Sequence, residues 1–389
     1  MTERMKLSKI IRLYPTKEQE IKFRKFCGVA RWTWNTCLEF MNKQYEQGYF
    51  VKVQDMIDYV KGIKYQDGYE WILEVPEAVT KQAIKDLDLA RSRYIEAKKK
   101  KEEAVKKGII LGIDICFPTF HKKDMYESFY QRTDKIKQRD DKHIMITRVG
   151  KVKTSKFKLP NKVGNPRIKY DGKYWYLTFC YDINIDKKEC TDKNIGIDLG
   201  LNNMAVLSTG KVYRNINKDR KIKILERRKK IIQRKLSYKY LCSKCKYGKE
   251  VKSNNIKKLE ALVRVIERKI RNIRKTYIHT ITKEVVKLLP KSIIIEDLKV
   301  KRMLKNRYLS HSISKMGWYM FRQFLSYKSK IWGIKFIVAD KYYASSQICS
   351  CCKNKKLMPL KLRIYECKNC GLTIDRDLNA AYNLAAYID

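Results

Sequence analysis

The sequence has few acidic residues for its size and no long apolar segment. Its 389 residues include 88 lysines and arginines but only 41 aspartates and glutamates, which gives a formal net charge of +47. Like charges on this scale repel one another in a compact fold unless a polyanion neutralises them, so a large nucleic acid is the expected partner. With no apolar run of about 18 residues and no apolar N-terminal segment, neither a membrane span nor a secretory leader is expected. These absences predict a soluble, intracellular protein that binds nucleic acid.

Two familiar catalytic signatures are also missing. The four histidines form no recognisable triad with serine or cysteine, so catalysis by a nucleophilic side chain is not expected. No glycine-rich loop ends in Gly-Lys-Ser or Gly-Lys-Thr, which argues against ATP-driven activity. The composition is nevertheless that of folded domains, with 44% hydrophobic and 11% aromatic residues. The length predicts two or three such domains.

Apolar periodicity divides the chain into three regions. Alternation at residues 7–13 predicts a strand, and apolar spacings of three and four from 17 to about 107 predict helices. Between about 108 and 189, the runs IILGIDI, HIMITRV, PRIKYDG and KYWYLTFCYDI predict a small β-barrel or meander, into which the helical unit is inserted. From about 191 onward strands and helices alternate, which predicts a mixed α/β sheet.

The third region contains both strand and helix signals. NIGIDLG, NNMAVLSTG, SIIIEDL and KFIVAD predict strands. A basic stretch at 217–289, with a break near residues 247–248, predicts a hairpin of two helices. Further helices are predicted at 318–332 and 378–387.

Three carboxylates follow buried strands or begin a helix in this region. They are Asp198 in GIDLG, Glu296 in SIIIEDL and Asp377 in DRDLNAAYNL. Carboxylates that meet at one edge repel each other and are costly to desolvate unless a cation joins them. The set therefore predicts a pair of Mg²⁺ or Mn²⁺ ions for phosphodiester hydrolysis. Within DRD we take Asp377 as the ligand and Asp375 as a residue that supports it from outside the ligand set.

Each carboxylate alone also has an ordinary explanation. Asp198 could be a turn residue, and Glu296 could cap the following helix or pair with an arginine. Asp375 and Asp377 could be acids that stabilise a helix N-terminus. The three together, in this order on an alternating sheet, favour the metal site.

Five of the 12 cysteines crowd into one short stretch. Four of them form two Cys-x₂-Cys pairs separated by fourteen residues, namely Cys349, Cys352, Cys367 and Cys370. This spacing is typical of four thiolates around one structural zinc ion, which would fold the loop that precedes the Asp377 helix. Cys351 is an alternative ligand beside Cys352. The pair Cys242 and Cys245 has no second pair near it in the sequence and is not expected to bind metal.

Basic and aromatic residues alternate in several segments, among them ARWTWNT, KYWYLTF and KDRKIKILERRKKIIQRK. Lysine and arginine suit backbone phosphates, and aromatic rings suit bases or sugars. Most of these aromatic residues are nevertheless expected in cores or interfaces.

With these motifs in hand, the sequence resembles the TnpB family, insertion-sequence proteins related to type V CRISPR effectors. The likeness runs through nearly the whole chain, from RLYPTKEQE, GVARWTWN and WILEVPEAVTKQAIKDLDLA onward. Four C-terminal blocks carry it most specifically: GIDLGLNNMAVLSTG, the segment from IEDLKVK to KSKIWG, SSQICSCC and YECKNCGLTIDRDLNAAYNLA.

The resemblance implies a multidomain α+β protein. Residues 191–389 would form a RuvC-like α/β nuclease domain of the RNase H type, with a zinc ribbon inserted at about 345–374. Residues 1–16 and 108–190 would form a wedge β-barrel domain, and residues 17–107 a helical recognition domain.

The resemblance also assigns site residues. The family's three catalytic, Mg²⁺-binding positions correspond to Asp198, Glu296 and Asp377, and its zinc ligands to the four paired cysteines. The family places residues beside target DNA near Thr80, Lys81, Gln82 and Lys85. The chain departs from the family's CSxCG pattern because it has CSCCK, with Lys353 in place of the glycine.

The implied function is that of an RNA-guided DNA endonuclease with two-metal catalysis. Such a protein holds a noncoding guide RNA, recognises a short motif beside the target on double-stranded DNA and displaces one strand. We expect a monomer rather than a dimer, in the cytoplasm of a prokaryote and at the nucleoid when bound to DNA. One alternative is a guided DNA-binding protein or transposition accessory that does not cut, which the three filled acidic positions disfavour. Another is an unguided junction-resolving nuclease, which leaves the N-terminal half unexplained.

Overall fold

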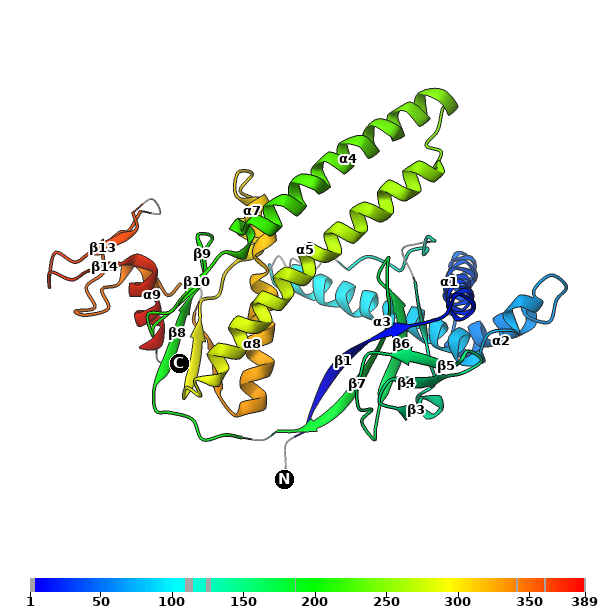
Figure 1. Cartoon of the computed structure of the whole chain (residues 1–389), viewed down its shortest axis with the longest axis horizontal. Coiled ribbons are helices and arrows are strands. Elements are labelled where there is room, and N and C mark those ends of the chain that lie inside the picture. Colours follow the sequence, from blue (N-terminus) through cyan, green and yellow to red (C-terminus); the bar gives the residue numbers. More distant parts are fainter. Residues whose placement is uncertain are drawn as a thin grey trace. The chain divides into compact units, whose positions relative to one another are not determined.

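The computed structural model describes residues 4–108, 115–123, 127–185, 187–340, 342–359 and 362–387. The chain forms two compact units, whose elements are labelled in Figure 1. One unit comprises Lys6–Ile183, and the other comprises Met1–Met5 together with Asn184–Asp389. None of the described helices is both long enough and apolar enough to cross a membrane.

The first unit contains a seven-stranded sheet and three long helices. Its elements are β1 (Arg4–Tyr14), α1 (Lys17–Glu46), α2 (Val53–Ile63), α3 (Glu77–Lys106), β2 (Ser128–Tyr130), β3 (Lys137–Asp140), β4 (His143–Ile146), β5 (Gly150–Thr154), β6 (Gly164–Tyr170) and β7 (Trp175–Asn184). The strand order is β2-β6-β7-β1-β5-β4-β3. The predicted first strand and the insertion of the helices after it are therefore confirmed. Most of the predicted strand IILGIDI lies outside the described residues.

Helix α1 is fixed to this sheet by its cap and by its aromatic face. The Thr16 side chain accepts a hydrogen bond from the backbone N–H of Gln19, and the Gln19 side chain accepts one from the backbone N–H of Thr16. This capping box begins the helix. Phe23 packs against Phe129 and Trp175 of the sheet, with ring centroids 5.6 and 5.0 Å apart. The insertion thus shares its core with the strands around it.

The second unit contains a five-stranded mixed sheet. Its strands are β8 (Asn194–Asp198), β9 (Asn203–Leu207), β10 (Val212–Arg214), β11 (Ser292–Ile295) and β12 (Lys335–Val338). They lie in the order β10-β9-β8-β11-β12. The β8–β9 and β9–β10 pairs are antiparallel, whereas β11 is parallel to both β8 and β12. The predicted mixed α/β sheet is confirmed.

Helices and a small ribbon surround this sheet. They are α4 (Arg220–Tyr247), α5 (Asn254–Lys287), α6 (Val300–Met303), α7 (Ser310–Met316), α8 (Trp318–Trp332), β13 (Ile364–Glu366), β14 (Thr373–Asp375) and α9 (Arg376–Ala385). Helices α4 and α5 form the predicted hairpin, which breaks at Gly248 with a left-handed φ of 64°. Helix α9 begins two residues earlier than predicted because Asp375 provides its N-cap.

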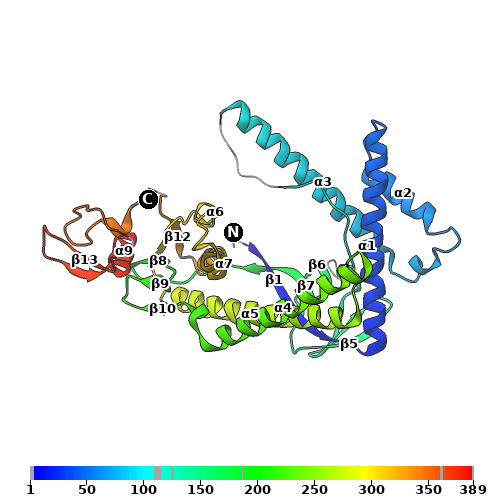
Figure 2. The same ribbon diagram turned by 90° about the horizontal axis from the view of Figure 1, so that it is seen from above.

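The sheet has apolar layers on both faces. Ile293 and Ile295 of β11 belong to the core that contains residues of α5 and α8, whereas Ile294 between them packs with Leu384 of α9. Such alternation is expected because successive side chains of a strand point to opposite faces. Figure 1 shows α9 on one side of strand β8 and α8 on the other, and Figure 2 likewise shows α9 beside β8.

Gly196 allows α9 to lie directly on strand β8. A Cβ atom at this position would overlap the carbonyl oxygen of Ala381 and the amide nitrogen of Ala385, and would lie 2.8 Å from the Cβ of Leu384. The Asn194 side chain also donates a hydrogen bond of 3.3 Å to the Ala385 carbonyl. The backbone of the helix therefore approaches the strand more closely than any larger residue at 196 would permit.

Replacing Gly196 by alanine is expected to destabilise the second unit by about 1–3 kcal/mol or more, because the added methyl group overpacks the helix–strand contact. Thermal unfolding of the purified protein measures this change. The Gly28→Ala variant is the matched control, since a Cβ at Gly28 in α1 would meet nothing within 4 Å. That control should melt at the wild-type temperature or above it, and an unchanged melting temperature for Gly196→Ala would contradict the close packing.

Candidate active site

The three predicted carboxylates are brought together at one edge of the second sheet. Asp198 is the last residue of β8, and Glu296 follows the last residue of β11. Because these two strands are parallel neighbours with Ile197 opposite Ile295, the two acids end adjacent strands. Asp377 lies in the first turn of α9, the helix packed on β8 across Gly196.

The carboxylates interact electrostatically. The pKa of Asp198 is raised well above its ordinary value, first by burial and then by the negative charges of Asp377, Glu296 and Asp375, while Arg376 opposes the shift. Burial also raises the pKa of Glu296, with a further contribution from Asp297. These shifts arise because desolvation and like charges both penalise the ionised form. Hard divalent cations prefer such oxygen ligands, so the residues present fit Mg²⁺ or Mn²⁺.

Asp377 has arginine partners. It is 8% exposed, and one of its oxygens lies 3.2 Å from the guanidinium of Arg376. The other oxygen lies 3.7 Å from Arg363, which precedes strand β13. Asp375 instead accepts hydrogen bonds from the backbone N–H groups of Asp377 and Leu378, both at 3.0 Å. Asp375 therefore caps α9, one of the ordinary explanations considered above, and thereby orients the turn that contains Asp377.

The four paired cysteines form a compact cluster. Among the described residues, Cys349, Cys352, Cys367 and Cys370 are the group whose possible ligand atoms all lie within 4.8 Å of one another. The Cys349–Cys370 and Cys352–Cys367 sulfur atoms are 3.6 and 3.5 Å apart. Four sulfurs at about 2.3 Å from a tetrahedral zinc ion would be about 3.8 Å apart, so the cluster fits zinc. The three carboxylates do not form a group of this kind among the described residues.

The geometry of the cluster shows that Cys352, and not Cys351, belongs to the group of possible zinc ligands. Cys351 is exposed and outside the cluster. Hydrogen bonds from the Asn369 side chain and the Asn354 backbone lower the pKa of Cys352 to about 6, which favours the thiolate that binds metal. Cys242 and Cys245 are exposed and likewise outside the cluster.

The two knuckles have the same backbone geometry. Lys353 donates from its N–H to the Cys349 carbonyl at 3.0 Å, and Gly371 donates to the Cys367 carbonyl at 2.9 Å. Their φ angles are 61° and 73°. Lys353 thus adopts the left-handed conformation that glycine adopts in the second knuckle, at a cost of about 1–2 kcal/mol. The substitution in CSCCK therefore leaves the first knuckle intact.

Two buried asparagines, which sequence reasoning missed, join this cluster to α9. The Asn379 side chain donates to the Ile348 carbonyl at 2.7 Å and accepts from the Ser350 N–H at 2.9 Å. Asn383 donates to the carbonyls of Ser345 and Ile348 at 2.9 and 2.6 Å. Both asparagines are 0% exposed. Their spacing of four residues on an otherwise apolar helix face was the available signal.

The predicted DNA contacts on α3 differ in exposure. Thr80 is buried and its hydroxyl donates to the Glu77 carbonyl at 2.9 Å. The Gln82 side chain donates to Asp86 at 3.0 Å. Lys81, which pairs with Glu77 at 3.0 Å, and Lys85 are exposed. A contact of this segment with DNA remains a prediction.

Three family models match the chain. The model described as "Helix-turn-helix domain" matches residues 1–49, "Probable transposase" matches 178–307, and "Cas12f1-like, TNB domain" matches 318–384. In the structure, the first of these segments contains strand β1 and the single helix α1. The third segment contains α8, the cysteine cluster and nearly all of α9.

Whole-length relatives are found among known proteins. A protein of Escherichia coli K12 named "Putative RNA-guided DNA endonuclease InsQ" is 26% identical over 96% of this chain and 90% of its own. A Streptomyces pristinaespiralis protein with the same description is 25% identical over 99% of this chain and 90% of its own. A TnpB-like protein of Methanocaldococcus jannaschii is 24% identical over 54% of this chain and 45% of its own.

Similarity to solved structures is weaker. The mini-RNA-guided endonuclease CRISPR-Cas_phi3 covers 99% of this chain and 92% of its own at 10% identity, with a TM-score of 0.47. A Cas12f1 chain in a complex with sgRNA and target DNA covers 98% and 99% at 14% identity, with a TM-score of 0.32.

Fold and site together define a multidomain α+β protein with a carboxylate centre and a cysteine cluster suited to zinc. The family models and the sequence relatives confirm, in addition, that the chain resembles the TnpB family, as its motifs indicated.

Exchanging Cys352 for serine is expected to remove bound zinc, because three thiolates leave the tetrahedral site incomplete. Cys351→Ser is the matched control, since it removes the neighbouring thiol from outside the cluster. Metal analysis of the purified proteins should find about one zinc ion per chain in wild type and in Cys351→Ser, and much less in Cys352→Ser. Equal zinc loss in the two variants would show that Cys351 is a ligand.

Asp198→Asn is expected to raise the melting temperature in the presence of a chelator at neutral pH. A raised pKa in the folded state penalises the fold above the pH at which an ordinary aspartate ionises. The penalty is full above the raised pKa, shrinks as the pH falls below it, and is absent below the ordinary aspartate pKa. A gain of ~1 kcal/mol corresponds to about 2–4 °C for a domain of 150–250 residues. The difference should therefore shrink towards acid pH.

Added Mg²⁺ should raise the melting temperature of the wild type but not that of Asp198→Asn. Exposed Asp192 provides the control, and Asp192→Asn should behave as the wild type with and without Mg²⁺. If Asp198→Asn melted below the wild type in chelator, the repulsion inferred here would be wrong.

Proposed function

We propose that this protein is an RNA-guided DNA endonuclease that hydrolyses phosphodiester bonds at the Asp198, Glu296 and Asp377 centre. The observation that carries the proposal is that three separate elements bring these carboxylates to one sheet edge, where their charges interact. The printed names of the whole-length relatives support the same activity.

The domain roles are part of this proposal. A sheet of three antiparallel strands followed by two parallel ones, with helices on both faces, supports a RuvC-like domain of the RNase H type at residues 191–389. The zinc ribbon at about 345–374 lies within it. The sheet of the first unit supports the wedge role, and helices α1 to α3 support the recognition role.

The chain's own residues would share the chemistry. Two Mg²⁺ or Mn²⁺ ions, when bound, would polarise the scissile phosphate and lower the pKa of the attacking water. Asp198, Glu296 and Asp377 would hold these ions. Arg363 and Arg376, which pair with Asp377, are close enough to the centre to offset phosphate charge.

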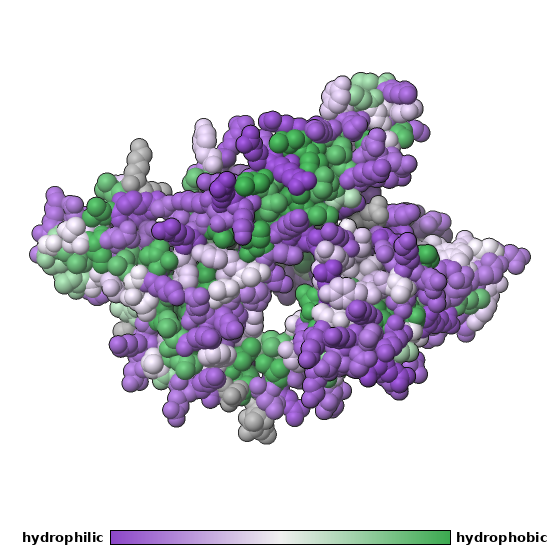
Figure 3. All heavy atoms as spheres, viewed as in Figure 1, coloured by the Kyte–Doolittle hydropathy of each residue, from purple (hydrophilic) through white to green (hydrophobic). Residues whose placement is uncertain are grey.

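The partners of the proposal are polyanions. A guide RNA, a double-stranded target and the displaced single strand would together neutralise the net charge of +47. Hydrophilic residues cover most of the face shown in Figure 3. Lysines and arginines recur along both helices of the α4–α5 hairpin, as in the run from Arg227 to Lys230.

Replacing Asp198, Glu296 or Asp377 by alanine should lower the rate of DNA cutting by at least about 100-fold, because each loss removes a ligand of the metal centre. The measurement uses purified ribonucleoprotein, Mg²⁺ and a duplex that matches the bound RNA. Gel-shift assays should show that each variant still binds RNA and target. If a variant lost RNA or target binding as well as cutting, the assignment of these residues to catalysis would be contradicted.

The same assay separates the alternatives. A wild-type complex that binds the matched duplex stably without cutting would favour a guided DNA-binding protein. Full activity of a preparation free of nucleic acid would favour an unguided nuclease.

A further inference from the structure

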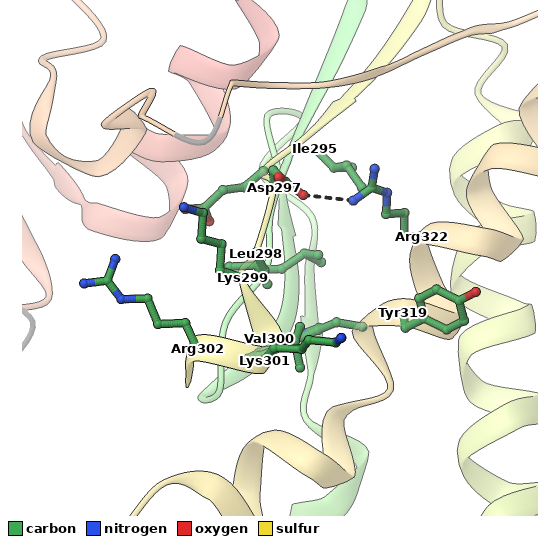
Figure 4. Close-up of a pocket in the computed structure, with 12 residues that line it drawn as sticks. Ile295, Asp297, Leu298, Lys299, Val300, Lys301, Arg302, Tyr319 and Arg322 are labelled. Atoms are coloured by element: carbon green, nitrogen blue, oxygen red, sulfur yellow. Dashed lines mark hydrogen bonds and ion pairs between the residues drawn. The ribbon is translucent and has the colours of Figure 1, made fainter. Parts of the chain in front are cut away.

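A cavity of about 470 Å³ lies beside Glu296, on the side formed by the segment that follows β11 and by the start of α8 (Figure 4). Its size lies within the range of pockets that enclose small ligands. The carboxylate centre uses Glu296 but none of the other residues that line this cavity. The cavity therefore offers a second binding surface within the same domain.

The inner wall of the cavity is mostly apolar. It is formed by Leu199, Ile295, Leu298, Val300 and Trp318. Trp318 is 4% exposed, and its indole N–H has no hydrogen-bond partner among the described residues. Because this nitrogen is buried, Trp318 contributes apolar ring surface to the wall.

An aromatic ring stands at the entrance. Tyr319 is 71% exposed although it is the second residue of a well-packed helix and lines the cavity. In Figure 4 it lies on α8, across from the segment Leu298–Arg302. Exposed aromatic rings are the side chains on which nucleic-acid bases stack.

The rim of the cavity is basic. Lys299, Lys301, Arg302 and Arg322 contribute cations. Asp297 accepts a hydrogen bond of 2.9 Å from Arg322, which holds this arginine across the gap between the segment and α8. Cations around an apolar cavity suit a ligand that has a flat apolar part and an anionic part.

We propose that this cavity receives one unpaired nucleobase of the DNA strand being cut, with the flanking phosphates on the basic rim. This inference rests on the proposed function and deepens it, because it names the residues that hold the substrate strand. Tyr319 would stack on the base, and the apolar wall would pack against it. Capture of one base next to Glu296 fixes the register of the strand at the carboxylates, and with it the position of the cut.

The test combines damaged DNA with a matched pair of protein variants. Abasic residues are placed one at a time along each strand of a matched duplex target, and single-turnover cutting is measured with the wild-type ribonucleoprotein. One abasic position near the cut should slow cutting by about 5- to 100-fold, the range expected for loss of a stacked base.

Tyr319→Ala should slow cutting of the intact target by a similar factor. On the target with that abasic position it should add little, because both changes remove the same contact. Tyr308→Ala is the control, since Tyr308 is 93% exposed and outside the cavity lining, and it should cut the intact target at the wild-type rate. Additive effects of Tyr319→Ala and the abasic residue, or no sensitive position, would overturn the proposal.

A second measurement does not depend on cutting. In the Asp198→Asn protein, 2-aminopurine at successive positions of the target strands should be quenched at one position on complex formation, and Tyr319→Ala should restore its fluorescence. Quenching in a wild-type complex that never cuts would refute the proposed function and leave the base site standing. Cutting of the target without quenching at any position would refute the base site and leave the proposed function standing.

Discussion

The close contact between helix α9 and strand β8 is the constraint on which the candidate centre depends. Asp198 and Asp377 are 179 positions apart in the numbering and belong to elements on different layers of the domain. They meet because Gly196 leaves room for the backbone of α9. Glu296 joins them through ordinary parallel pairing of β11 with β8. A single absent side chain therefore permits the third carboxylate to reach the other two.

The carboxylates of the centre repel one another, and the structure around them holds them in place. Burial and neighbouring negative charge raise the pKa of Asp198, so the arrangement favours either a proton or a cation. Arginines on Asp377 reduce the repulsion in part. The loops of the cysteine cluster are hydrogen-bonded to α9 through Asn379 and Asn383, which positions the helix that contains Asp377. Its four cysteines would fill the coordination of a zinc ion, so its contribution is positional rather than chemical.

Sequence reasoning succeeded where a residue pattern has one strong physical explanation. Apolar strands ending in Asp198 and Glu296 predicted neighbouring acids at a sheet edge, and paired cysteines predicted a four-sulfur cluster. It failed where the partner is a backbone atom far along the chain, because such a partner leaves no signature in residue identity. The bonds of Asn379 to the segment near Ile348 and the space over Gly196 are of this kind. Thr80 lies three, four and seven positions before the buried residues Ala83, Ile84 and Leu87, so the period of this helix face was the signal for its burial.

The bonds from Asn379 and Asn383 have a further consequence for the conditions under which the site keeps its shape. Amide side chains carry no charge and do not titrate, and these two are shielded from solvent. Neither acid nor added ions weakens such bonds as they weaken exposed ion pairs. The frame that holds Asp377 should therefore tolerate changes in ionic conditions that alter how strongly the basic surface holds nucleic acid.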